Sequence, residues 1–243
     1  VSQTAPEELA RVQVIVNTSR MQRRLRSLFD AGPARLLPKI HLVTQLDQLA
    51  PGIAVPPAVK PLRRRLELIA LVARLIEQQK ELAPRTSLYD LTDSLAALMD
   101  EMQGEGVTAD TINGLDVSDL SGHWQRTQTF IRIAQDYLSR TTTTPDKEAQ
   151  QRQFVSALAD RWAIDPPRHP VILAGSTGSR GTTMLLMEAI ARLPQGALVL
   201  PGFDFDMPRQ QWLHLDDVLL SEDHPQYRFY KLMQHIGVGR SDI

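Results

Sequence analysis

The residues whose types and spacing suggest chemistry lie in a glycine-bearing loop at positions 174–183. Its glycines, Gly175, Gly178 and Gly181, are evenly spaced by three. A phosphate-binding P-loop needs G-x-x-x-x-G-K-[ST], with the lysine on the outer phosphates and the hydroxyl on magnesium. Counted from Gly175, the second glycine of that motif falls on Arg180, and no lysine follows. The G-x-G-x-x-G dinucleotide pattern also fails, so the glycines favour a tight turn from a strand into a helix.

Two enzymatic alternatives remain for this loop. Arg180 and Thr182 are the side chains that could contact a phosphate, which leaves a nucleotide-dependent transferase open. A serine hydrolase with Ser176 or Ser179 as nucleophile is the other alternative. The nucleophile elbow G-x-S-x-G, however, needs glycine at position 177, where Thr177 stands.

A basic face forms the second chemical feature. It belongs to a helix predicted from Met21 to Phe29, and Asp30 is the nearby carboxylate that opposes it. Asn17, Thr18 and Ser19 precede the helix and supply capping chemistry. The face is either an ordinary solvated surface or a patch for the phosphate backbone of a nucleic acid, where Thr18 and Ser19 add neutral hydrogen bonds. Its basic residues are Arg20, Arg23, Arg24 and Arg26, with Arg35 and Lys39 further along.

Metal chemistry finds little support in the residue pattern. The six histidines are scattered and no pair has the H-x-x-x-H spacing of metal ligands. Carboxylates between positions 204 and 223 alternate with apolar residues, which is typical of solvated loops. Cysteine is absent, which excludes disulfides, thiolate metal sites and iron–sulfur clusters within these residues. We therefore expect no metal and no cofactor in this segment.

The elements that position these residues follow a strand–helix–strand rhythm. Apolar runs bounded by turn residues predict short buried strands, and the helix between the last two predicts a βαβ unit of a parallel sheet. Ligands bind at the carboxyl ends of such strands, so the loops 174–183 and 201–207 should face any site. We expect an α/β fold with a parallel sheet of about four strands. The predicted strands are 11–16, 39–44, 171–173 and 197–200.

A helical block separates the second predicted strand from the third. The helix from Leu62 to about Leu82 has an apolar stripe so wide that we expect it to be largely buried. Ser87 should cap the next helix, and Pro145-Asp146 should start the last. Further helices are expected at 108–115 and across Leu120, Trp124, Ile131 and Leu138, and the tryptophans and phenylalanines should be core. The predicted domains are 1–56 with 166–243, and the helical insertion 57–165.

Composition sets the remaining limits. The chain has 243 residues, a formal net charge of -1 and 23% charged residues, so no global basic excess demands nucleic acid. No apolar run approaches the roughly 20 residues of a membrane span. The polar N-terminal sequence lacks the apolar region of a signal peptide, which predicts a cytoplasmic protein without a membrane partner. Because the chain begins without methionine, it is expected to be a processed chain or a piece of a longer one.

Several longer stretches of sequence are similar to those of a known protein family. They are VILAGSTGS, IARLPQGALVLPGFDFD and HPQYRFYKLMQHIGVGRSDI, preceded by NTSRMQRRLR, LLPKI and PPAVKPLRRRLELIALV. Together they resemble the alphaproteobacterial type of AddB, the subunit of the AddAB helicase–nuclease that carries an inactivated superfamily 1 helicase-like region. The resemblance spans residues 11–243. Complete AddB proteins are several times longer and end in a nuclease domain with an iron–sulfur cluster. The chain therefore resembles the N-terminal portion only.

The resemblance implies a RecA-like domain (1A) interrupted by a helical subdomain (1B). In active relatives, the strand that matches 171–173 ends in Asp-Glu, which hold magnesium and activate water. Ala174 and Gly175 stand there instead. The resemblance thus implies a degenerate nucleotide site without ATP hydrolysis, with ATP and magnesium used only by the partner motor. Thr18, Ser19 and Arg20 fall where active helicases place motif Ia, which contacts the backbone of single-stranded DNA.

The leading hypothesis is a non-catalytic, helicase-like scaffold in double-strand-break repair. It would grip one DNA strand at a processed end, take part in recognising a recombination hotspot, and dock onto an AddA-type subunit. The alternatives are an enzyme that uses loop 174–183 and a pure protein-interaction module. The residues expected to contact DNA are Thr18, Ser19, Arg20, Arg23 and Arg24, with Arg180 and Thr182 second.

Overall fold

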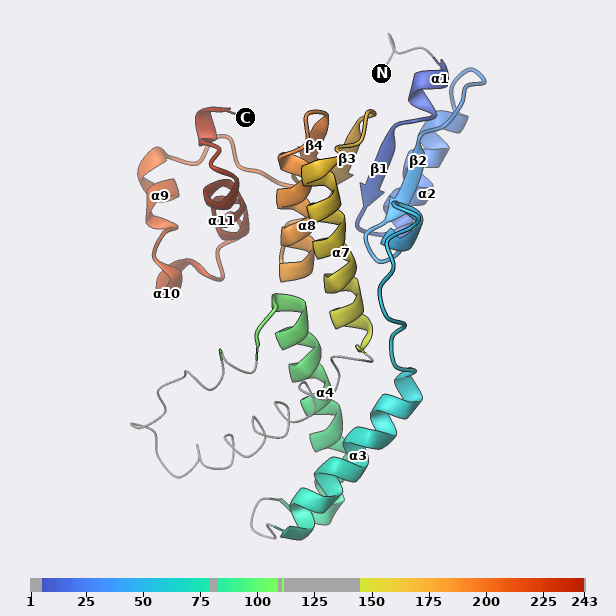
Figure 1. Ribbon diagram of the computed structural model, residues 1–243. Helices are drawn as coiled ribbons and strands as arrows, with labels where there is room; N and C mark the ends of the chain where they lie inside the picture. The colour runs from blue at the N-terminus through green and yellow to red at the C-terminus, as the bar shows by residue number, and fades with distance from the viewer. Residues whose placement is uncertain (1–5, 79–82, 109–110, 112–144, 243) are drawn as a thin grey trace. The chain divides into compact units, whose positions relative to one another are not determined.

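The computed structural model describes residues 6–78, 83–108, 111 and 145–242 and divides the chain into two compact units (Figure 1). Unit 1 comprises Val1–Ile53 and Phe154–Ile243, and unit 2 comprises Ala54–Gln153. The second boundary lies inside helix α7 (Lys147–Ile164), whereas the sequence placed it after residue 165. The reason is that the first residues of α7 belong to unit 2 and the remaining residues belong to unit 1. Its Arg152 donates to the Gly104 carbonyl of unit 2, and its Arg161 donates to the Pro51 carbonyl of unit 1.

Unit 1 contains a four-stranded, all-parallel sheet in the order β2-β1-β3-β4. The α/β class and the parallel sheet of four strands are therefore confirmed. Strands β1, β3 and β4 are mostly apolar, as expected for parallel strands covered by helices, whereas β2 also carries Lys39 and His41. Ile15, Val171 and Leu173 are almost completely buried. The strands are β1 (Gln13–Val16), β2 (Lys39–Leu42), β3 (Val171–Ala174) and β4 (Gly196–Val199).

Two helices lie on opposite faces of this sheet. Helix α8 (Gly181–Ala191) packs on β3 and β4, where a Cβ added to Gly196 would lie 1.8 Å from the Ile190 carbonyl oxygen. Helix α2 (Ser19–Asp30) packs on β1 and β2. Alternate residues of a strand point to opposite faces. Gly196, which approaches α8, lies in the row of paired residues that contains Lys39, whereas the next residue, Ile40, lines a cavity together with side chains of α2. The two rows point to opposite faces, so α8 and α2 cover different sides of the sheet.

Unit 2 contains two helices that lie side by side, α3 (Pro61–Gln78) and α4 (Leu88–Glu105) (Figure 1). Their shared core is Leu68, Val72, Ile76, Leu95 and Met99. The prediction that the long helix is largely buried is wrong for its first turns.

In those turns Leu62 and Leu66 are 69% and 57% exposed. There the side of α3 facing α4 carries arginines, and Arg64 and Arg65 form ion pairs with Asp100 and Asp93. The two leucines are consequently turned away from the pair.

The helix caps are partly as expected. Asp146 accepts a hydrogen bond from the Ala149 amide at 3.0 Å, as an N-cap residue does, and α7 follows. Ser87 makes no side-chain capping bond, because it ends a 3₁₀ turn, Arg85–Ser87, that runs directly into α4. Phe154 and Trp162 are buried as predicted. Of the helix expected at 108–115, only residues 108 and 111 are described, and the Thr108 hydroxyl accepts a hydrogen bond from the Thr111 amide at 3.2 Å. The rest of it, and the helix expected across 120–138 with Trp124, lie outside the described residues.

The C-terminal part of unit 1 has a core that the sequence did not reveal. Met207, Trp212, Phe229 and Tyr230 pack together, with Phe203 against them.

The described helices of the chain include none long and apolar enough to cross a membrane. The elements not yet named are α1 (Pro6–Leu9), α9 (Arg209–His214), α10 (Val218–Ser221), α11 (Tyr227–Ile236), and the 3₁₀ turns Leu46–Gln48 and Arg240–Asp242.

Candidate functional site

The candidate site lies where the chain leaves two neighbouring strands in opposite directions. From β1 the chain passes through α2 to β2, and from β3 it passes through α8 to β4, on the other side. In open parallel sheets, ligands bind at the carboxyl ends of the strands at such a switch point. This topology brings the segment that follows β1 beside the segment that follows β3, where Asn17 contacts Gly175. The sequence named loops 174–183 and 201–207 as facing a site, and it did not predict this pairing.

Two contacts hold the two strand ends together. The Asn17 side-chain amide donates to the Gly175 carbonyl at 3.3 Å. Gly175 has φ +79°, and a Cβ there would lie 2.7 Å from the Met21 sulfur of α2. A side chain at position 175 would therefore have to displace the end of the Met21 side chain, and it would also require a backbone conformation that residues other than glycine rarely adopt. Sequence reasoning assigned Asn17 to capping and missed this link, because the link joins positions 158 apart.

The start of α2 is fixed by Thr18. Its backbone is extended, and its hydroxyl accepts a hydrogen bond from the Met21 amide at 3.2 Å. This is N-cap geometry, which satisfies one of the free amides of the first turn. Ser19 is exposed, and its carbonyl accepts a bond from Arg23 Nε at 3.4 Å. The Thr18 hydroxyl is thus committed to the helix, whereas the Ser19 hydroxyl is open to solvent.

The loop between β3 and α8 presents fewer groups than its sequence suggests. Ser176 is buried, with 7% of its surface exposed, and its hydroxyl accepts a bond from the Gly178 amide at 3.3 Å. Ser179 is exposed, but no described histidine bonds to either serine. A serine nucleophile needs such a base within hydrogen-bond reach. Thr182 is buried, with 4% of its surface exposed, so it is not open to a phosphate in solvent. Arg180, at the N-cap of α8, is exposed and gives the loop a positive charge that faces solvent.

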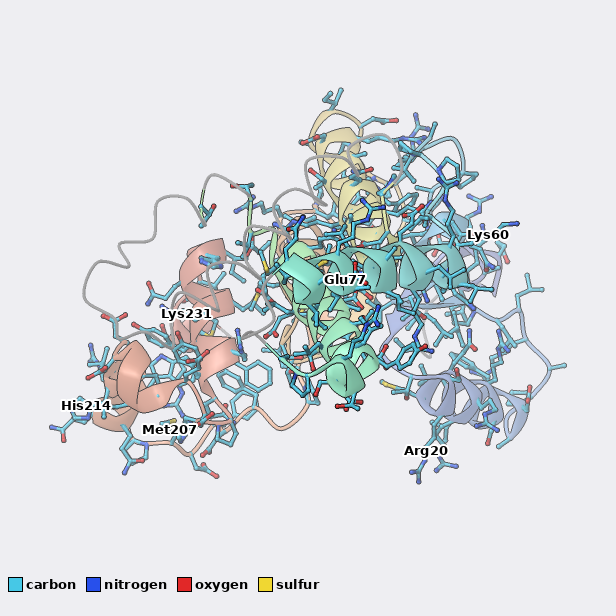
Figure 2. All side chains as sticks on the ribbon, turned by 90° about the horizontal axis from the view of Figure 1, so that it is seen from below. Arg20, Lys60, Glu77, Met207, His214 and Lys231 are labelled. Carbon is cyan, nitrogen blue, oxygen red and sulfur yellow. The ribbon has the colours of Figure 1, made fainter. Side chains whose placement is uncertain are left out.

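The basic face of α2 is the strongest feature of the site. Arg20, Arg23, Arg24 and Arg26 are all exposed, and no residue of α2 is fully buried. Figure 2 shows Arg20 extending away from the helix ribbon. Within the described part of the chain, none of these four guanidinium groups is paired with a carboxylate.

The three arginines in the first turns of α3 are arranged differently. Arg63 pairs with Glu67, Arg65 pairs with Asp93, and Arg64 pairs with both Asp100 and Asp146. An arginine cluster of similar density therefore has its charges neutralised by the protein itself. The α2 cluster keeps its charges available to an external anion, and sequence alone did not distinguish the two clusters.

The titratable groups with displaced pKa values lie away from the switch point. Burial, together with the nearby charge of Lys39, lowers the pKa of His41 in β2. Burial raises the pKa of Asp146 in unit 2, and burial also raises the pKa of Tyr230 in α11. The described residues contain no group of three or more histidine or acidic side chains that could hold a metal ion. The switch point therefore offers positive charge and backbone groups, without a displaced acid or base.

Comparison with models of protein families gives no match for this chain, and comparison with curated protein sequences gives none either.

Proposed function

We propose that this chain is a non-catalytic, helicase-like region that grips one strand of DNA and serves as a scaffold in double-strand-break repair. The proposal takes the parallel sheet of unit 1 as RecA-like and the helical unit 2 as its inserted subdomain. It rests on the resemblance of residues 11–243 to AddB and on the basic face of α2. Under this proposal the partner that supplies ATP-driven movement is an AddA-type subunit.

The unpaired arginines of α2 are the observation that carries the DNA-binding part. Arg20, Arg23 and Arg24 lie in the first two turns of a helix that starts at the carboxyl end of β1. Guanidinium groups bind phosphates with two parallel hydrogen bonds, and backbone contacts of this kind position a protein on DNA without reading its sequence. Ser19 adds a free hydroxyl at the same end of the helix.

The non-catalytic part follows from the side chains that end β3. Hydrolysis of a nucleoside triphosphate needs carboxylates to hold magnesium and to position the attacking water. Ala174 ends in a methyl group and Gly175 has no side chain, so neither supplies an oxygen ligand or a proton acceptor. Arg180 can attract a phosphate, but it cannot replace those carboxylates.

Fluorescence anisotropy of a labelled single-stranded oligonucleotide at low salt tests the proposal. The protein should bind, and an Arg20→Ala/Arg23→Ala/Arg24→Ala variant should bind at least about tenfold more weakly, since each phosphate contact contributes to affinity. The matched control is Arg74→Ala/Arg192→Ala/Arg209→Ala. It removes the same charge from exposed positions outside α2.

Two outcomes contradict the proposal. If the protein binds no oligonucleotide at low salt, α2 is a solvated face and a protein-interaction module becomes the better account. If the control variant loses as much affinity as the α2 variant, binding reflects overall charge and not the α2 face. Circular dichroism of both variants checks that they remain folded.

A further inference from the structure

A second candidate site lies at the opposite ends of the strands. A half-open cavity of about 600 Å³ lies between the sheet and α2, and residues that directly precede the four strands form much of its rim. The first turns of α2, with Arg20, Arg23 and Arg24, lie at the carboxyl end of β1, so this cavity is separate from the switch point. Ligand pockets typically have volumes of about 300–1,000 Å³.

The floor of the cavity is apolar. Val14, Ile40 and Ile172 come from three adjacent strands and occupy one row on the same face of the sheet, and Leu25 and Phe29 of α2 face them across the cavity. Four of these five side chains are only partly buried, and Ile40 is 8% exposed. On the cavity side these apolar side chains lack the packing partners that a protein interior provides. An apolar body of one or two rings would fill the space.

The rim of the cavity carries an excess of positive charge. Arg11 and Arg168 line it, and Glu8 is the one carboxylate among the lining residues. Neither guanidinium forms an ion pair with a described carboxylate. Two arginines at the rim of an apolar cavity supply the donors that a carboxylate needs, because a carboxylate accepts paired hydrogen bonds from guanidinium groups.

The rim is also held in place before any ligand arrives. The hydrogen bonds of the sheet continue past its strands, from the Gln13 amide to the Pro170 carbonyl at 2.9 Å and from the Val171 amide to the Gln195 carbonyl at 3.0 Å. The Gln195 side chain donates to the Arg168 carbonyl at 3.0 Å. Because the rim is already fixed, its residues lose little conformational entropy when a ligand binds, and the free-energy cost of binding is smaller.

We propose that this cavity binds a small carboxylic acid with an apolar body, the body on the Val14–Ile172 floor and the carboxylate between Arg11 and Arg168. This site is independent of the DNA-binding proposal, because it uses none of the α2 arginines. It assigns a ligand class to a part of the chain for which the sequence suggested no chemistry.

Isothermal titration calorimetry with 2-naphthoate as the probe tests the assignment. The intact chain should bind one equivalent, and an Arg11→Gln/Arg168→Gln variant should bind at least tenfold more weakly. Uncharged 2-naphthol has the same rings, so it should bind more weakly than 2-naphthoate and should lose nothing in that variant. An Arg192→Gln/Arg209→Gln variant is the matched control and should bind 2-naphthoate as the parent does.

The proposal is overturned if the parent shows no saturable binding of 2-naphthoate at millimolar concentration. It is also overturned if the Arg11→Gln/Arg168→Gln variant binds as well as the parent does, because the carboxylate would then not be recognised. An Ile172→Phe variant provides a second readout, since a ring placed on the floor should block both probes while leaving oligonucleotide binding intact.

Discussion

At the scale of single residues, what distinguishes the candidate site is which charges are left unpaired. Arginines are abundant on both α2 and the first turns of α3, but Arg63, Arg64 and Arg65 of α3 are neutralised by carboxylates of the protein. Exposed ion pairs contribute only about 0–1 kcal/mol to stability, so the pairs of Arg63 and Arg65 matter less for stability than for removing free charge. The α2 arginines have no such partners among the described residues and remain available.

Arg240 is a residue whose role is structural. Its guanidinium donates to the carbonyls of Asp204 and Phe205 at 2.8 and 2.7 Å and also to that of Met207, and it lies 5.3 Å from the centre of the Trp212 ring. Arg240→Lys should lower the free energy of unfolding by about 1–2 kcal/mol, since an ammonium cannot reach all three carbonyls. Urea denaturation measures this loss. Arg209→Lys, at an exposed position, is the control, and an equal loss in both variants would contradict the assigned role.

His41 predicts a pH dependence of stability. Burial, with a smaller effect from Lys39, lowers its pKa in the folded state below the ordinary 6.5, and its Nε2 is buried without a hydrogen-bond partner. Below pH 6.5 the unfolded chain therefore binds more protons at this position, so the free energy of unfolding should fall as the pH drops through that range. Well above pH 6.5 His41 is neutral in both the folded and the unfolded chain, so it no longer makes the free energy of unfolding depend on pH.

Denaturation of the parent and of His41→Gln between pH 5.5 and 7.5 measures the effect. The parent should lose more stability than the variant between pH 6.5 and 5.5. Equal losses in the two proteins would show that His41 titrates alike in the folded and unfolded states.

At the scale of elements, α8 and β4 are joined by a contact that only glycine permits. A Cβ at Gly196 would lie 1.8 Å from the Ile190 carbonyl oxygen, so Gly196→Ala must push β4 away from the end of α8. The expected loss is about 3 kcal/mol, as for overpacked cores, and thermal unfolding measures it.

Gly104→Ala is the matched control for this substitution. A Cβ at Gly104 would meet nothing within 4 Å, and the residue lies inside helix α4, so alanine should raise stability by up to about 1 kcal/mol. If Gly196→Ala proved as benign as Gly104→Ala, the close packing of α8 on β4 would be refuted.

At the scale of the whole molecule, local patterns predicted the sheet but not the pairing of distant groups. Short, largely apolar runs between turn residues identified the four strands of the described sheet, and the signal is most continuous in β3, which is buried on both faces. The wide stripe of α3 did not reveal which side meets α4, so Leu62 and Leu66 were wrongly predicted to be buried. The Asn17–Gly175 bond, the aromatic core around Trp212 and the cavity above Val14 depend on residues far apart in sequence.

The net charge of the whole molecule also bears on the proposed function. At -1, the chain as a whole does not attract a polyanion, so any binding to DNA has to come from a local excess of positive charge. The α2 face provides that excess. Binding carried by a few phosphate contacts releases a matching number of counterions, which gives it a salt dependence that can be counted.

The measurement that tests the central claim most directly is the slope of log K against log salt concentration for single-stranded DNA, in the parent and in Arg20→Ala/Arg23→Ala/Arg24→Ala. Each phosphate contact on a single strand contributes about 0.7 to the slope, so losing three contacts should make it shallower by about 2. The Arg74→Ala/Arg192→Ala/Arg209→Ala control should keep the parent slope. An unchanged slope in the α2 variant would contradict the account, because the phosphates would then be held elsewhere.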